Sequence, residues 1–214
     1  MSSFWTEDDF QVFGVPGLEE RMEQLTVQIR PKFEELGSRF APFLSEAAGD
    51  EHFVHIAKHA RRTVNPPQDS WVAFAANKRG YKAYPHFQIG LWKSHVFIIL
   101  AVIYEARSKD RMARDLLENG EVHDLPGDFV LSGDHMKPEA ERIGDLSAEE
   151  ITRLMVRFRD VKKGELVIGR HIPADEAAAM STERFFSFTE DTFKELLPIY
   201  ETMVHGVKST SYSG

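Results

Sequence analysis

The chain has 214 residues, of which 42% are hydrophobic and 28% charged, with a formal net charge of -8 and no cysteine. This length suits one large domain with a sizeable core, and the lack of cysteine excludes disulfides and cysteine-ligated metal sites. The acidic balance argues against a surface that is basic throughout, as nucleic-acid and anionic-membrane binders need.

Two helices are predicted first, over residues 18–43. Apolar residues recur there at helical spacing in two sets, Leu18, Met22, Leu25, Ile29 and then Phe33, Leu36, Phe40, Phe43. Such spacing is typical of amphipathic helices. Pro31 lies between the sets, where proline either kinks a helix or opens a new one in its first turn. We predict a break at this position.

Four strands follow, because short apolar runs then alternate with turn-forming residues. The runs begin at Phe53, Trp71, His86 and Val96. The turn residues Lys93 and Ser94 lie between the last two runs, which predicts a hairpin. We expect an antiparallel sheet that packs on the N-terminal helices.

The second half returns to helices, predicted over 108–120, 147–161, 174–180 and 190–204, with short strands from Phe129 and Glu165. Ser147 and Glu150 match a capping box, and Gly120 is a suitable C-terminal cap. Together the elements predict a single α+β domain over 1–208. It has a mainly antiparallel or mixed sheet of about six strands packed with N-terminal and C-terminal helices. A flexible tail is expected at 209–214.

The stretch HIAKHARRTVNPP, residues 55–67, is unusually basic for this acidic chain. In a helix His55 and His59 would lie ~6 Å apart and could chelate one metal ion. In a strand they share a face but lie ~13 Å apart, too far for one ion. Neighbouring Val54 and Ile56 favour the strand, so we expect no metal site and assign no cofactor.

Alternation along the strands predicts a polar sheet face. One face of the third strand carries His86, Gln88, Gly90 and Trp92, and the other carries Phe87, Ile89 and Leu91, which suit the core. The first strand would add His55, His59 and Arg61. Such a face could bind a small polar ligand; the alternative is a sheet face that simply contacts water.

Basic residues cluster between His52 and His86, with six Lys or Arg against the single acid Asp69. Arg61 and Arg62 could pair with phosphate or carboxylate, and backbone N–H groups of the turn 77–80 could assist. The remaining basic island consists of Lys58, Lys78, Arg79 and Lys82. Its alternative role is to keep a hairpin tip soluble and to discourage edge pairing.

We therefore predict a cytoplasmic protein that binds a small phosphate- or carboxylate-bearing molecule. The candidate ligand-binding residues are His55, His59, Arg61, Arg62, His86, Gln88 and Trp92. Arg61 would supply charge and His86 a switchable donor. One alternative is a nucleic-acid-binding protein that uses the basic island over 58–82, with Trp71, Tyr81, Tyr84 and Trp92 as stacking surfaces. Another is a protein–protein interaction module without a ligand site.

Motifs for catalysis and membrane insertion are missing. There is no P-loop, no Gly-x-Gly-x-x-Gly and no Gly-x-Ser-x-Gly, so no catalytic residue is assigned. The residues of SGDH (Ser132–His135) are neighbours in a predicted turn and cannot form a hydrolytic triad among themselves. The longest apolar run, 96–104, is about half of the ~20 residues that a membrane helix needs, so no membrane partner is expected.

Several segments resemble the YktB-like family of uncharacterised bacterial proteins, a domain of unknown function found mainly in Firmicutes. They are GLEERMEQL, IRPKFEELG, HIAKHARRTVNPP, WVAFAANKRGYKAYPHFQIGLW and VIYEA. The resemblance extends over roughly residues 17–106 and implies a single-domain α+β fold. It implies no activity, cofactor or catalytic residue.

Overall fold

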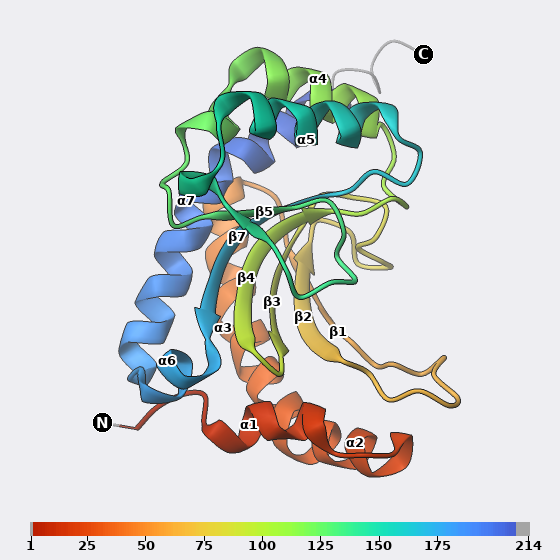
Figure 1. The fold of residues 1–214 in the computed structure, drawn as a ribbon, viewed down its shortest axis with the longest axis vertical. Coiled ribbons are helices and arrows are strands. Elements are labelled where there is room, and N and C mark those ends of the chain that lie inside the picture. Colours follow the sequence, from red (N-terminus) through yellow and green to blue (C-terminus); the bar gives the residue numbers. More distant parts are fainter. Residues whose placement is uncertain (1, 209–214) are drawn as a thin grey trace.

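The computed structural model describes residues 2–208, so the predicted tail at 209–214 lies outside the described residues. A seven-stranded sheet forms the centre of the fold, in the order β1-β2-β3-β4-β7-β5-β6, and neighbouring strands are antiparallel throughout (Figure 1). The strands are β1 (Phe53–Ile56), β2 (Asp69–Ala75), β3 (His86–Trp92), β4 (His95–Val102), β5 (Val130–Ser132), β6 (Glu141–Arg142) and β7 (Leu166–Pro173). The predicted α+β class is confirmed, with one strand more than the expected six or so.

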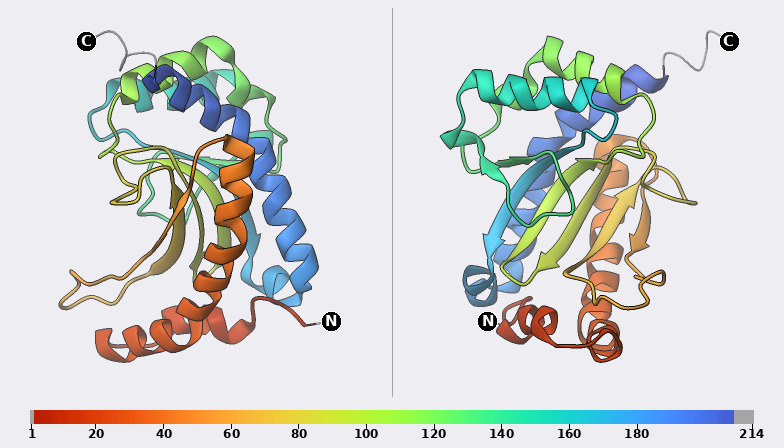
Figure 2. Two further views of the ribbon diagram at one scale, coloured as in Figure 1. Left: turned by 180° about the vertical axis from the view of Figure 1, so that it is seen from behind. Right: turned by 45° about the vertical axis from the view of Figure 1, so that its right-hand side comes forward.

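The helices cover one face and one end of this sheet. They are α1 (Glu7–Gln11), α2 (Leu18–Gln24), α3 (Arg30–Ala48), α4 (Lys109–Asn119), α5 (Ala148–Asp160), α6 (Ala174–Ala179) and α7 (Thr182–Lys208). Helices α3 and α7 lie side by side on one face, while α4 and α5 pack together at the end of the sheet (Figures 1 and 2). Among the described residues, none of the helices combines the length and the apolar character that crossing a membrane requires.

The helix bends near Pro31 but does not break as predicted, because helical backbone runs without interruption from α2 into α3. A π-helical turn, Leu25–Ile29, connects α2 to α3, and Pro31 stands in the first turn of α3. The helix axis changes direction there, so that α2 lies across the foot of the molecule and α3 runs along the sheet (Figure 2). Proline suits this position because the first N–H groups of a helix have no partner within it.

The helix ends in the second half also follow their sequence signals. Gly120 adopts a left-handed backbone (φ 81°) directly after α4. The capping box before α5 is formed, since Ser147 Oγ accepts from Glu150 N at 3.3 Å and Glu150 Oε2 accepts from Ser147 N at 2.9 Å. The last helix is longer than predicted and continues through Pro198.

The first strand is shorter than predicted. It ends at Ile56, and His59 has a left-handed backbone (φ 50°) that starts a turn in which Arg62 N donates to His59 O at 3.0 Å. The expectation that His59 and Arg61 continue the strand is therefore wrong. The β-branched residues stop at Ile56, and the following AKHARR carries no residue type that favours a strand.

The core lies between the sheet and the pair α3 and α7. Phe87, Ile89 and Leu91 are fully buried, as predicted from alternation along β3. The Phe87 ring lies 5.2 Å from Phe193 and 5.0 Å from Tyr200, both on α7. One face of β3 is thus committed to the core, and the other face is free to build a site.

Candidate functional site

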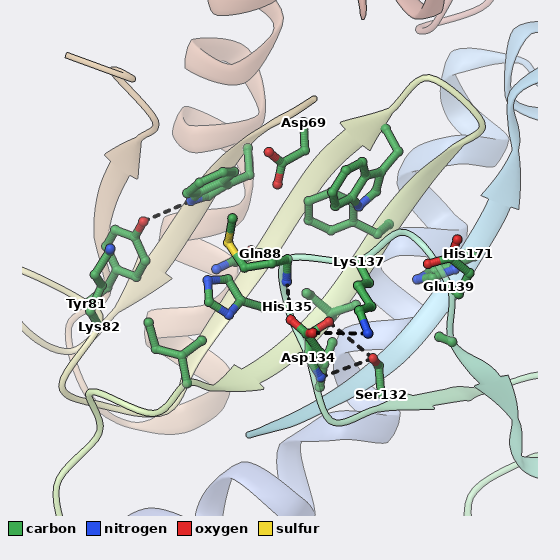
Figure 3. Close-up of a pocket in the computed structure, with 18 residues that line it drawn as sticks. Asp69, Tyr81, Lys82, Gln88, Ser132, Asp134, His135, Lys137, Glu139 and His171 are labelled. Carbon is green, nitrogen blue, oxygen red and sulfur yellow. Dashed lines mark hydrogen bonds and ion pairs between the residues drawn. The ribbon is translucent and has the colours of Figure 1, made fainter. Parts of the chain in front are cut away.

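A pocket lies on the face of the sheet opposite α3 and α7. Its roof is the segment 133–140 between β5 and β6, which crosses in front of the strands in Figure 2 (right). The cavity has a volume of about 120 Å³, smaller than the roughly 300–1,000 Å³ of sites that hold a drug-sized molecule, so it suits one small group of a ligand. Figure 3 shows that side chains from the sheet and from the roof point into it.

The floor of the pocket is apolar because glycine stands in the middle of β3. A Cβ atom on Gly90 would clash with the Phe97 ring and would lie 2.6 Å from Ser70 O. Gly90 faces Phe97 across the β3–β4 ladder, so the missing side chain lets the ring lie over β3. Phe97 belongs to a small apolar cluster against which Trp71 and Trp92 pack.

His86 positions Gln88 at this floor. Tyr84 O accepts from His86 Nδ1 at 2.8 Å, and Gln88 Nε2 donates to His86 Nε2 at 2.8 Å. His86 is fully buried, and desolvation lowers its pKa to about 4. The predicted role of His86 as a switchable donor near neutral pH is therefore wrong, because the ring is neutral and both nitrogens are engaged. Gln88, at 7% exposure, is also no part of a solvated face.

Asp69 brings a buried carboxyl group to the pocket. It faces Trp92 directly across the β2–β3 ladder, and Trp71 follows on the same face of β2. Its desolvation raises the pKa of the carboxyl group to about 6, although the charges of Arg62 and His135 lower it. Trp71 Nε1 donates to the Tyr81 hydroxyl at 3.0 Å, which holds a second aromatic ring at the pocket wall.

A histidine and a glutamate fasten the roof to the sheet. Glu165 Oε2 accepts from the backbone N of His135 at 2.9 Å and from its Nδ1 at 2.7 Å, while Oε1 accepts from Tyr104 N at 3.2 Å. Burial alone would raise the pKa of Glu165, but the hydrogen bonds from His135 and Tyr104 hold it below its usual value. With Nδ1 engaged, Nε2 is the free nitrogen of His135, a residue that lines the pocket.

Asp134 completes a group that could hold a metal ion. One ligand atom from each of Asp134, His135 and Glu165 lies within 4.8 Å of the other two. A divalent ion bound through Nδ1 of His135 would replace the hydrogen bond to Glu165, since Nδ1 cannot donate a proton and bind a metal at the same time.

A basic groove adjoins the pocket. Among the described residues, its cationic side chains are Lys58, Arg79, Lys82 and Arg107, and Glu105 is the one acid that lines it. His55 also lines the groove and donates from Nε2 to Asn77 O at 2.9 Å. Tyr81 and Lys82 line both the pocket and the groove, so the two hollows adjoin at these residues.

The structure separates the residues that the sequence predicts as one ligand face. Gln88 and Trp92 line the pocket, and His55 lines the groove. The other predicted residues, His59, Arg61, Arg62 and His86, line neither hollow.

The basic stretch 55–67 leaves the sheet after β1 ends at Ile56, which separates His55 from His59 and the two arginines. His59 hydrogen-bonds Ser70 Oγ at 3.1 Å, and burial lowers its pKa to about 4. Arg61 is exposed, and Arg62 donates to Asn65 O at 3.5 Å. The expectation that His55 and His59 share a strand face is wrong, because the chain leaves the sheet before His59.

Part of the basic island does assemble in the groove. Lys58, Arg79 and Lys82 line it, whereas Lys78 is exposed and lines neither hollow. The turn at 77–80 offers fewer free N–H groups than expected, because Asn77 Oδ1 accepts from Arg79 N at 2.9 Å and from Gly80 N at 3.3 Å.

Comparisons with known proteins place this chain among close relatives. A family model described as Domain of unknown function (DUF1054) matches residues 5–200. A UPF0637 protein of Lysinibacillus sphaericus (strain C3-41) is 55% identical over 201 residues, covering 94% of this chain and 95% of that protein. UPF0637 proteins of Exiguobacterium sibiricum and Bacillus mycoides (strain KBAB4) are 46% and 48% identical. Their matches cover 94% and 92% of this chain, and 98% and 95% of those proteins.

Proposed function

The chain belongs to the DUF1054 family of UPF0637 proteins, and we propose that it binds a small molecule carrying a phosphate or carboxylate group. The predicted membership of an uncharacterised family from Firmicutes is confirmed. The observation that carries the proposal is the junction of pocket and groove at Tyr81 and Lys82. A single ligand can place its anionic group in the basic groove and its apolar part in the aromatic pocket.

The charge distribution supports an anion in the groove. Four cationic side chains face one acid there, although the chain as a whole has a net charge of -8. A basic patch in an acidic protein concentrates the attraction for an anion at one place. Arg79 and Arg107 can each offer two parallel N–H donors, which match the geometry of phosphate and carboxylate oxygens.

The aromatic residues favour a small ligand over a nucleic acid. Trp71 is held by its hydrogen bond to Tyr81, and Trp92 packs against the cluster of Phe97 at the pocket floor. Stacking surfaces for single strands need ring faces open along the path of the strand. These indoles instead line one enclosed hollow, which suits a compact molecule.

A thermal-shift series tests the proposal. The compounds are nucleoside monophosphates, sugar phosphates and di- and tricarboxylic acids. At 100 times its Kd a ligand stabilises by about 2.7 kcal/mol, roughly 5 to 10 °C for a chain of this size. The double variant Arg79→Ala, Arg107→Ala should lose this shift, because both cations line the groove.

Lys78→Ala is the matched control. It removes a neighbouring cation that lies outside both hollows, so its shift should equal that of the wild type. The proposal fails if no compound stabilises the wild type, or if the double variant responds as strongly. Binding of short oligonucleotides that falls by orders of magnitude with added salt would instead favour a nucleic-acid partner.

A further inference from the structure

The Asp69 carboxyl group lines the pocket, and the one hydrogen bond known for it within the described residues comes from its own backbone N–H. Asp69 is 8% exposed, and across the described residues its carboxylate forms neither a hydrogen bond nor an ion pair with another side chain. Its carboxylate points into the pocket in Figure 3. Buried charges are normally paired, because removing a carboxylate from water is costly.

The neighbours of Asp69 narrow the choice of partner. Trp92 stands directly opposite on β3, Trp71 follows on β2, and the Phe97 ring covers Gly90 beside them. Aromatic faces carry negative charge and attract cations, most strongly when the cation is shielded from water. A carboxylate among indole rings therefore favours a cation. An anionic group would be repelled by the carboxylate and by the ring faces.

Among the described residues, the cationic side chains around the pocket do not pair with Asp69, since Lys137 pairs with Asp134 at 3.6 Å and Lys82 with Glu105 at 3.4 Å. Arg62 is close enough to lower the pKa of Asp69, but its guanidinium donates to Asn65 O and does not line the pocket. The His135 ring, which also lines the pocket, is hydrogen-bonded through Nδ1 to Glu165. The position beside Asp69 is thus open to a cation that comes with a ligand.

We propose that the aromatic pocket binds an organic ammonium group, which pairs with the carboxylate of Asp69 between the rings of Trp71 and Trp92. This inference deepens the function proposed above and rests on it. The ligand then has two charged ends, with the ammonium group in the pocket and the phosphate or carboxylate group in the groove beyond Tyr81 and Lys82.

Three probe compounds test the contributions of the two charged groups separately. Phosphocholine carries both charges. Its uncharged-carbon isostere, 3,3-dimethylbutyl phosphate, carries only the anion, and tetramethylammonium carries only the cation. Calorimetric titration of the intact protein with the two phosphates measures their Kd values, and the tryptophan fluorescence of Trp71 and Trp92 reports tetramethylammonium in the pocket.

The variants are chosen to distinguish the pocket from the groove. In the wild type, phosphocholine should bind about tenfold more tightly than its isostere, since a desolvated ammonium–aromatic contact with a carboxylate supplies more than 1 kcal/mol. Asp69→Asn should remove this tenfold advantage and the fluorescence response, but leave the Kd of the isostere unchanged. Glu46→Gln removes an exposed acid that lines neither the pocket nor the groove, and it should change neither.

The outcomes separate this inference from the proposed function. If the isostere binds as tightly as phosphocholine, or if tetramethylammonium leaves the fluorescence unchanged, the ammonium site is wrong, while binding of the phosphates to the groove still stands. If tetramethylammonium binds and Asp69→Asn abolishes the response, but neither phosphate depends on Arg79 and Arg107, the ammonium site stands and the anion groove is wrong.

Discussion

The two faces of strand β3 are covered in different ways. Phe87, Ile89 and Leu91 belong to one large cluster shared with α3 and α7. On the other face Gln88 and Trp92 meet a pocket whose roof is a single loop, 133–140. Side chains from the helices pack against the first face, whereas the loop covers the second face and leaves a cavity beneath it. We infer that the first face carries the stability of the sheet and the second carries its function.

The largest effect should come from the filled face. Phe87→Ala should lower the free energy of unfolding by about 3–5 kcal/mol, because it leaves a cavity next to Phe193 and Tyr200. Chemical denaturation followed by circular dichroism measures this. Trp92→Ala, on the other face of the same strand, should cost less than about 2 kcal/mol because its indole is half-buried beside open space. Equal losses for the two variants would contradict the assigned roles.

The next effect has the opposite sign and depends on pH. Asp69→Asn should raise the free energy of unfolding by about 3 kcal/mol at pH 8 and hardly change it at pH 4. The pKa of Asp69 is about 6 in the folded protein against 3.8 for a free carboxyl group. Between these values the folded state keeps a proton that the unfolded state has lost, so the wild type loses stability as the pH rises from 4 to 6. Above pH 6 the folded protein bears the full cost of burying an ionised carboxylate, and asparagine, which has no charge, removes this cost.

Denaturation curves at several pH values test this linkage. Glu139→Gln serves as control because its carboxylate is exposed and its charge should cost little at any pH. A destabilised Asp69→Asn protein at pH 8 would show that the carboxylate has an internal partner, and it would remove the reason for a ligand cation. A stabilised one fits a residue kept for binding, since functional sites often hold groups that lower stability.

The sequence predicts the two faces of β3 well because a strand alternates with a period of two residues. His86 to Trp92 appears as one run, and Gly90 and Trp92 fall on the polar side as observed. Alternation says nothing about the partner of each polar residue, however. His86 is predicted as a donor to ligand, but its Nδ1 donates to Tyr84 O and its Nε2 accepts from Gln88 Nε2.

The roof of the pocket could not be predicted in this way. His135 and Glu165 are 30 residues apart and lie in two different connections, so no local spacing links them. The charge density around Arg61 gave a misleading signal, because the strand that should carry it ends at Ile56. Arg107 completes the groove from a segment that follows β4, outside the cluster of basic residues in the sequence. These contacts depend on tertiary packing.

The smallest effect should come from loosening the roof. In Glu165→Gln the amide can accept at one position only, so it cannot serve both Tyr104 N and the two donors of His135. We expect a loss of about 1–2 kcal/mol, and faster hydrogen exchange concentrated in 133–140.

Glu139→Gln, an exposed acid within the same loop, should leave the exchange rates as they are. Faster exchange across the core strands in Glu165→Gln would contradict a local role for the contact between Glu165 and His135. If only the loop 133–140 exchanges faster, the loop can open without unfolding the core on the other face of β3. A ligand that enters a covered pocket requires such local opening.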